Sequence, residues 1–256
     1  MDSLVHSKEK VYFGISLVVS ILVYSLLIFS VVGILYLLLG LVLGLVFHGL
    51  FIGNLKGNGI LVSEWQFPEV HKIASQLATE MELKELPPIY VLQAGGMLNA
   101  FATKFLGSSF VVIYSDVLEL AYEEGGDELA FVICHELAHL KRRHPTWRLI
   151  LYPSMMVPFL GAAYSRACEY TCDSFGAYYV PKGAESGLLV LAAGKKLYRS
   201  VNVDSYLRQV RSADGFWVWF SEVVSSHPNL TKRIKALKQG TAQRTYDDLM
   251  VKSGNA

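Results

Sequence analysis

The N-terminal part of the chain is a long apolar tract. Between Lys10 and Lys56 there is no Asp, Glu, Lys or Arg. A single helix of this length would measure about 67 Å, which is more than twice the hydrocarbon thickness of a bilayer. The tract therefore predicts a hairpin of two transmembrane helices, at about 11–32 and 34–52, with a tight turn near Gly33.

Lysines flank this hairpin at its two ends. Lys8 and Lys10 precede the first helix and Lys56 follows the second, whereas the turn carries no positive charge. Because lysine and arginine favour the cytoplasmic end of a membrane helix, both ends of the hairpin are expected in the cytoplasm. A cleaved signal peptide is not indicated, because the apolar core is too long and lacks a small-residue cleavage site.

The chain beyond the hairpin has helical and strand periodicity in turn. Helices are expected where apolar side chains recur every three to four residues, at 68–83, 127–144, 184–199, 203–210 and 216–224. Two short strands are expected at 89–92 and 109–114, the second half-buried or at a sheet edge. These elements predict an α+β, mostly helical domain with a small sheet.

Residues 53–59 are rich in Gly and Asn and predict a flexible linker after the hairpin. We therefore divide the chain into a membrane anchor, residues 1–56, and a cytoplasmic domain, residues 57–256. A mean hydropathy of +0.36 agrees with this division, because the apolar excess lies in the anchor. The net charge of +1 gives no basic footprint for nucleic acid, so no nucleic-acid partner is expected.

The helix at 127–144 carries two histidines, His135 and His139, with Glu136 beside the first. Residues four apart on a helix lie on one face, so both imidazoles can reach one metal ion at roughly 2.0–2.1 Å. Glu136 stands beside the pair, where it suits a general base rather than a third ligand. This pattern is typical of zinc hydrolases.

A third metal ligand has to come from outside this motif. A metzincin would have Gly at position 142 and His at position 145, but this chain has Arg142 and Pro145. His144 falls one residue short and is interpreted as an exposed histidine at the helix end. Glu169 and Asp173 share a helix face, so Glu169 can bind the metal while Asp173 accepts the second ring N–H of a ligand histidine.

All three cysteines, Cys134, Cys168 and Cys172, lie beside these motifs. They form no disulfide framework and suit a reducing compartment. A zinc site that contains cysteine is an alternative to the carboxylate site. We favour packing roles for the thiols, because two histidines and one glutamate already complete a catalytic set of three protein ligands.

The motifs together resemble those of the HtpX-type membrane-bound zinc metallopeptidases, which are relatives of the CAAX prenyl proteases. The similarity extends from about Phe67 to Leu237. It rests on the HExxH motif and on a few further segments, namely Ser165–Asp173, Ser226-His227-Pro228 with Arg233 after it, and Asn99-Ala100-Phe101-Ala102 before a strand.

The resemblance implies a zincin-like fold and a set of roles. It implies one Zn²⁺ per chain, with His135, His139 and Glu169 as ligands and Glu136 as the base for a zinc-activated water. His227 would donate a hydrogen bond to the oxyanion, and Arg233 would tie its region to the cleft. Asn99 and Ala100 would contact the substrate backbone. From the residues alone, a turn residue is the favoured interpretation of Asn99, whereas His227 is equally a helix-entry residue and Arg233 equally a surface residue.

A second apolar segment, Leu149–Ser165, contains no charged residue. As a single span it would put His139 and Glu169 about 30 Å apart across the bilayer, although one metal must bind both at about 2 Å. Pro153 and Pro158 would also interrupt a straight helix. Two interpretations remain: a broken helix that lies in the membrane interface or covers the active site, or a helix buried in the core. The aromatic run at 216–220 is similarly either core or a membrane contact.

The sequence thus predicts a membrane-anchored zinc metalloendopeptidase of the gluzincin type. The resemblance implies protein or peptide substrates, especially membrane or misfolded proteins, and a bacterial or archaeal cell membrane. One alternative is a CAAX-type prenyl-protein protease, for which two spans are too few to enclose a chamber. Another is a metal-stabilised membrane adaptor without turnover, which would have no use for the base Glu136.

Overall fold

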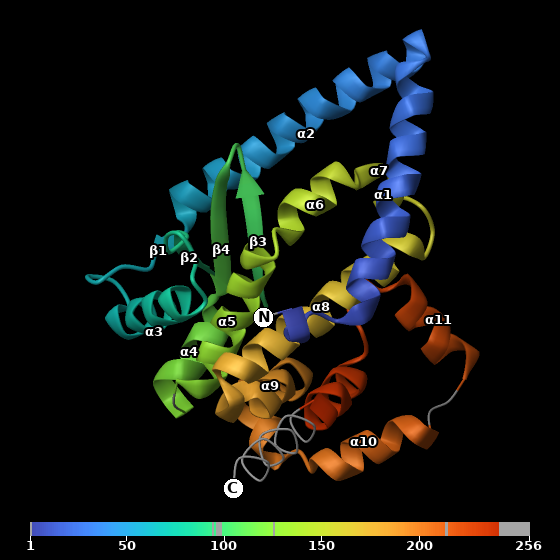
Figure 1. Ribbon diagram of the computed structural model, residues 1–256. Coiled ribbons are helices and arrows are strands. Elements are labelled where there is room, and N and C mark those ends of the chain that lie inside the picture. Colours follow the sequence, from blue (N-terminus) through green and yellow to red (C-terminus); the bar gives the residue numbers. More distant parts are fainter. Residues whose placement is uncertain (1, 94, 96–98, 125, 213–214, 241–256) are drawn as a thin grey trace, which may run out of the picture.

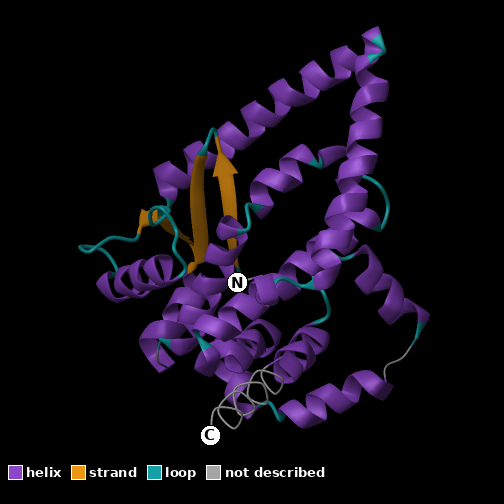
Figure 2. Ribbon diagram, viewed as in Figure 1, coloured by secondary structure: helices purple, strands orange, loops and turns teal. Residues whose placement is uncertain are grey.

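The computed structural model describes residues 2–93, 95, 99–124, 126–212 and 215–240. Helices dominate, and one small sheet lies beside them (Figure 1, Figure 2). The labelled α-helices are α1 (Ser7–Ile28), α2 (Val31–Asn58), α3 (Pro68–Glu80), α4 (Ser115–Glu124), α5 (Asp127–Lys141), α6 (His144–Ile150), α7 (Tyr152–Met155), α8 (Leu160–Tyr179), α9 (Ala184–Leu197), α10 (Val203–Ser212) and α11 (Phe216–Val224). Residues 230–240 are helical as well. The strands are β1 (Ile60–Leu61), β2 (Ile89–Leu92), β3 (Ala100–Phe105) and β4 (Ser108–Tyr114). The predicted mostly helical α+β class is confirmed.

Helices α1 and α2 form the predicted apolar hairpin, but its turn lies earlier than expected. Both are long and apolar enough to cross a membrane. The turn is at Phe29 and Ser30, where the Ser30 hydroxyl accepts a hydrogen bond from the Gly33 N–H at 3.2 Å and caps α2. A Cβ at Gly33 would collide with the carbonyl oxygen of Leu27. Gly33 is therefore needed for the close approach of the two helices, not for the turn.

The predicted flexible linker at 53–59 is wrong, because α2 continues to Asn58. Ile52 and Leu55 of α2 are buried against Phe110 and Val112 of β4. This burial outweighs the low helix propensity of the glycines in the segment. From the tip of the hairpin, α1 and α2 diverge, and α2 reaches the sheet while α1 reaches α8 (Figure 1).

The sheet has the strand order β1-β2-β4-β3, with β2 and β4 parallel and the other two pairs antiparallel. β4 is therefore an interior strand, and the prediction that 109–114 lies at an edge is wrong. Its poor alternation has a physical cause: Phe110 and Val112 pack against α2, whereas Val111 and Ile113 pack in the main core. The edge strand on that side is β3.

Helices α5 and α8 cross at the centre of the molecule (Figure 1). Every side chain of α5 from Leu129 to His139 except Ala130 is buried. A Cβ at Gly176 of α8 would collide with the ring of Phe131 in α5, so glycine permits the helices to approach closely. This packing turns the motif histidines of α5 toward the acidic residues of α8.

The segment Leu149–Ser165 folds back on itself through α6, α7 and the start of α8. It is not a buried core helix, because Leu149 is 73% exposed and Met156 is 70% exposed. On its other side the segment contacts α1, where the Ser154 N–H donates to the Ser20 hydroxyl at 3.4 Å. The segment thus presents apolar side chains at the surface next to α1.

The aromatic run at 216–220 forms most of α11, and it does not belong to the core. Phe216, Trp217 and Trp219 are 60%, 75% and 57% exposed. Arg166 of α8 holds the end of α11 by donating hydrogen bonds to the carbonyl oxygens of Glu222, Val223 and Ser225. The aromatic side chains are therefore held at the surface.

Candidate metal centre

Two imidazoles and one carboxylate meet between α5 and α8. The Nε2 atoms of His135 and His139 lie 3.3 Å apart. Glu169 places Oε2 3.3 Å from the first of these nitrogens and Oε1 3.4 Å from the second. Ligand atoms that share a tetrahedral metal at about 2.0–2.1 Å lie roughly 3.3–3.4 Å from one another. The two Nε2 atoms therefore have the spacing of two ligands of one Zn²⁺ ion, and Glu169 presents a different carboxylate oxygen to each of them at a similar distance.

The electrostatics of this cluster favour a cation. Burial would lower the pKa of His135, but hydrogen bonds to Asp173 and Glu169 raise it to about 10. Burial would raise the pKa of Glu169, but hydrogen bonds from His135 and His139 hold it well below its usual range. The two carboxylates thus favour positive charge beside them, which a bound dication would supply.

Cys172 offers a competing donor. Its thiol belongs with His135 and His139 to a buried group whose donor atoms all lie within 4.8 Å of one another. Burial raises the pKa of Cys172 well above its usual value, which keeps the thiol protonated, whereas a metal binds the thiolate. The thiol also lies 3.7 Å from the Nδ1 of His144, which contacts the Nδ1 of His139. Since both Nε2 atoms face Glu169, the carboxylate is the better-placed donor.

Asp173 and Arg233 support His135 from behind. Asp173 Oδ1 lies 3.1 Å from His135 Nδ1. Arg233 donates two hydrogen bonds to this carboxylate, from Nε to Oδ2 at 2.7 Å and from Nη2 to Oδ1 at 2.6 Å. Its Nη1 lies 3.5 Å from Glu169 Oε2. Arg233 is 5% exposed, so it is not a surface arginine.

His139 has a different partner, which the sequence did not indicate. The Nδ1 atoms of His139 and His144 lie 3.0 Å apart. His144 is 1% exposed, so its interpretation as an exposed helix-end residue is wrong. Helix α5 ends at Lys141 and a new helix begins at His144, which turns the ring inward. Burial lowers the pKa of His144 to about 4, so the imidazole is neutral.

Glu9 of α1 completes this arrangement. Its Oε1 lies 3.4 Å from His144 Nε2 and accepts a hydrogen bond from Arg142 Nη2 at 2.8 Å. The side chain is buried although it lies at the start of an apolar helix. The sequence gives one signal for this contact, an acidic residue at the edge of the apolar tract. Glu9 is far from His139 and His144 along the chain, so no short-range pattern connects it with them.

Glu136 lies beside the two histidines and is buried. Burial raises its pKa to about 7, although a hydrogen bond from the backbone of Ala102 opposes the rise. Ala102 belongs to β3, the edge strand of the sheet. The carboxyl group therefore lies between the metal-binding cluster and an edge strand of the sheet, with a pKa suited to exchanging protons near neutral pH.

The remaining predicted site residues lie at the rim or on β3. His227 Nε2 is 3.7 Å from Glu169 Oε1, and the side chain is 63% exposed. Asn99 directly precedes β3, and its Oδ1 accepts a hydrogen bond from the Ala100 N–H at 2.9 Å. Ala100 is the first residue of the strand that borders the cluster.

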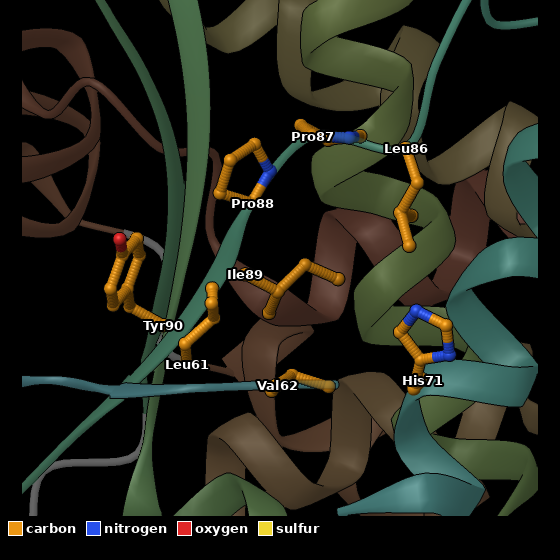
Figure 3. A pocket seen from close by; sticks show the side chains of 8 residues that line it. All are labelled: Leu61, Val62, His71, Leu86, Pro87, Pro88, Ile89 and Tyr90. Atoms are coloured by element: carbon orange, nitrogen blue, oxygen red, sulfur yellow. The ribbon is translucent and has the colours of Figure 1, made fainter. Parts of the chain in front are cut away.

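A hollow elsewhere in the molecule lies between the β1–β2 strands and α3 (Figure 3). Among the described residues, no carboxylate or thiol lines it, so these residues offer no metal-binding set of donors. Its wall is formed by Leu61, Val62, His71, Leu86, Pro87, Pro88, Ile89 and Tyr90.

Comparisons with known proteins place the chain in a family. The sequence profile described as Peptidase family M48 matches residues 64–159 and 150–241. The plastoglobule-localized metallopeptidase 48 of Arabidopsis thaliana chloroplasts is 27% identical over 221 residues, which cover 76% of this chain. The HtpX protease homologue of Pyrococcus abyssi is 25% identical over 228 residues, which cover 71% of this chain and 76% of the homologue.

The chain spans less than two thirds of the length of two of the proteins that it matches. It spans 63% of the length of the Arabidopsis relative. A crystal structure of Ste24p from S. mikatae aligns with a TM-score of 0.48 and 15% identity, over 84% of this chain and 58% of that protein. The profile match extends over most of the sequence and confirms the resemblance that the HExxH and Glu169 segments indicated. The chain belongs to peptidase family M48, a family of metallopeptidases.

Proposed function

We propose that this protein is a membrane-anchored zinc endopeptidase that hydrolyses membrane or misfolded proteins. The observation that carries the proposal is the spacing of His135, His139 and Glu169, whose donor atoms lie 3.3–3.4 Å apart. One Zn²⁺ per chain would be held by these three side chains. Glu136 stands next to them, and a purely structural metal site would not need such a base.

The chemistry follows from the groups around this cluster. When bound, Zn²⁺ lowers the pKa of a water molecule and polarises the carbonyl of the scissile peptide. Glu136 accepts the proton as the water oxygen attacks the carbonyl carbon, and it passes the proton to the leaving nitrogen as the C–N bond breaks. Its pKa of about 7 suits both transfers. His227, exposed at the rim, donates a hydrogen bond to the oxyanion.

The edge strand β3 would hold the substrate. A peptide that adds as a further strand obtains backbone hydrogen bonds without requiring a particular sequence. β3 ends the sheet and contacts Glu136 through Ala102. Asn99 and Ala100, at the start of β3, would contact the substrate backbone. This arrangement supports an endopeptidase of broad specificity, which suits misfolded substrates.

Asp173 and Arg233 would orient the centre. Asp173 would accept the Nδ1 proton of His135, so that Nε2 presents its lone pair to the metal. Arg233 bridges Asp173 and Glu169, because it lies 3.5 Å or less from both carboxylates. The roles of these residues are thus positional rather than catalytic.

The membrane position follows from the apolar surfaces. We infer that the α1–α2 hairpin crosses the bilayer with both ends in the cytoplasm, since Lys8 and Lys10 lie in the first turn of α1, before its apolar part, and Lys56 follows the apolar part of α2. The exposed side chains of Leu149 and Met156 would then lie in the membrane interface beside α1. The aromatic side chains of α11 would lie in the same layer.

Proteolysis by the purified full-length protein tests the function. In detergent, it should carry one zinc per chain and cleave casein, a chelator should stop cleavage, and Zn²⁺ should restore it. Membrane topology is tested separately by cysteines at Arg143 and Phe29, in a background without the native cysteines. An impermeant reagent should label Arg143→Cys and Phe29→Cys from opposite faces. Cleavage that persists without metal would reject the proposed function.

A further inference from the structure

A buried polar path connects the anchor helix α1 with the metal-binding cluster. It starts at Glu9, passes through the imidazole of His144 and ends at Nδ1 of His139. Glu9 is 4% exposed and His144 is 1% exposed. Burial of a carboxylate is unfavourable unless charged hydrogen bonds compensate, and Arg142 donates two such bonds, from Nε and Nη2, to Glu9 Oε1. A residue needed only for packing at this place on an apolar helix would be apolar.

The direction of each hydrogen bond in the path is fixed by the metal. If His139 binds through Nε2, the proton of its ring must be on Nδ1. His144 Nδ1, 3.0 Å away, then has to accept this proton, because two N–H groups cannot face each other. A neutral His144 therefore carries its own proton on Nε2, which faces Glu9 Oε1 at 3.4 Å. Among the described residues, the buried His144 Nε2 has no partner with full hydrogen-bond geometry, and the Glu9 carboxylate oxygen at 3.4 Å is the acidic group that faces it.

The same side chains could be considered as a second metal site. Donor atoms of Glu9, His144 and Cys168 lie within 4.8 Å of one another. However, the guanidinium of Arg142 already occupies Glu9 Oε1 at 2.8 Å, and burial raises the pKa of Cys168 to about 12, which keeps the thiol neutral. A cation would meet a fixed positive charge and only one anionic ligand there. The relay of hydrogen bonds fits these groups better.

We propose that Glu9 is a positioning residue for the metal ligand His139, and that it acts through His144. The inference rests on the proposed assignment of His139 as a ligand. A carboxylate behind a ligand imidazole fixes its tautomer and ring orientation and strengthens it as a donor. Here the carboxylate comes from the anchor helix, so docking of α1 on the catalytic domain is part of the metal site. Metal affinity should fall when this contact is broken.

The test measures zinc affinity of the full-length protein in detergent by competition with a chromogenic chelator. Glu9→Gln keeps the size of the side chain and removes its charge. It should weaken zinc binding by about 10–100-fold. The visible spectrum of the Co²⁺-loaded variant should also differ from that of the parent, because the ligand field at His139 changes. Unchanged affinity and spectrum would reject the proposal.

A double-mutant cycle separates the relay from a general effect on folding. His144→Asn places an amide oxygen near the position of Nδ1, so it can still accept the proton of His139, but it has no group that reaches Glu9. In this background Glu9→Gln should change zinc affinity by less than about twofold, because the path is already cut. An equal effect in both backgrounds would show that Glu9 acts through packing and would overturn the proposal.

Ser20→Ala is the matched control. Ser20 is a buried residue on the same helix, and its hydroxyl accepts a hydrogen bond from α7 rather than from the histidines. This variant should leave zinc affinity unchanged. If Glu9→Gln does not fold, the zinc affinity of His144→Asn tests the relay. This variant should also weaken zinc binding by about tenfold, and an unchanged affinity would reject the relay. A parent with two zinc ions per chain, one of which is lost in Glu9→Gln, would replace the relay with a second metal site.

Zinc affinity is measured without substrate. A failure of the relay can therefore be distinguished from a failure of the proposed peptidase function, which is tested by cleavage. A protein that binds zinc through this relay and cleaves no peptide would reject the peptidase and leave the relay intact. A protein that cleaves peptides and whose zinc affinity does not depend on Glu9 would reject the relay and leave the proposed peptidase function intact.

Discussion

The two ligand histidines are supported in different ways. Behind His135 stands the charged pair of Asp173 and Arg233, joined by two hydrogen bonds of 2.6–2.7 Å within the catalytic domain. Behind His139 stands the neutral ring of His144, and Glu9 lies 3.4 Å beyond it on the anchor helix. The support behind His135 has short hydrogen bonds, and both of its residues belong to the catalytic domain. The second support depends on the docking of another element, so the anchor can affect the metal site through His139.

The largest effect should come from a substitution that leaves both supports intact. Glu136→Gln keeps the shape of the side chain but cannot accept a proton, so peptidase activity should fall by about 10²–10⁴-fold. Zinc content, measured by elemental analysis, should stay at one per chain. Parental activity in this variant would show that Glu136 is not the base.

His227→Ala tests a group that belongs to neither support. His227 approaches Glu169 from the exposed rim, and loss of one oxyanion donor typically lowers kcat by about 10²–10³-fold. KM and zinc affinity should change little, because the side chain is not needed to hold substrate or metal. A change in KM with constant kcat would instead assign His227 to substrate binding.

Asp173→Asn breaks the support behind His135. It leaves Arg233 buried beside a neutral amide, and loss of one partner of a buried ion pair costs about 3–5 kcal/mol of stability. Zinc affinity should fall by about 10–100-fold as well. Denaturant unfolding and chelator competition measure the two effects. If stability remained at the parental value, the pair of Asp173 and Arg233 would not hold the centre together.

The smallest effect is expected for Ser20→Ala, which removes a contact between α1 and α7 without touching either support. The hydrogen bond is 3.4 Å long, so its loss should cost about 1 kcal/mol or less. Thermal unfolding of the detergent-solubilised protein checks the value. A loss of zinc in this variant would mean that docking of α1 as a whole, rather than Glu9, supports His139.

Short-range patterns predicted much of the fold. The helix at 68–83 and the strand at 89–92 have their own apolar periodicity and turn residues, and both are present. The linker at 53–59 was misjudged, because its glycines signal flexibility locally while burial of Leu55 against the sheet keeps α2 helical. The expectation that 109–114 lies at a sheet edge is wrong for a similar reason. Helix α2 covers one face of β4, and this contact between distant segments leaves no mark in the local sequence.

In the site, too, short-range patterns predict some features, whereas contacts between distant segments determine others. Spacing along single helices predicts that His135 and His139 share a face, as do Glu169 and Asp173, and the crossing of α5 and α8 brings the two faces together. The burial of His144 depends on where α5 ends, and its contact with Glu9 depends on how α1 docks. Neither leaves a local pattern, so the support behind His139 could not be predicted from sequence.

The central claim is that a carboxylate and two imidazoles, rather than the nearby thiol of Cys172, hold the metal. X-ray absorption at the zinc edge of the zinc-loaded protein tests it most directly. We expect only nitrogen and oxygen neighbours at about 2.0–2.1 Å, with the multiple scattering of two histidine rings. A sulfur neighbour at about 2.3 Å would contradict the claim and assign Cys172 as a ligand.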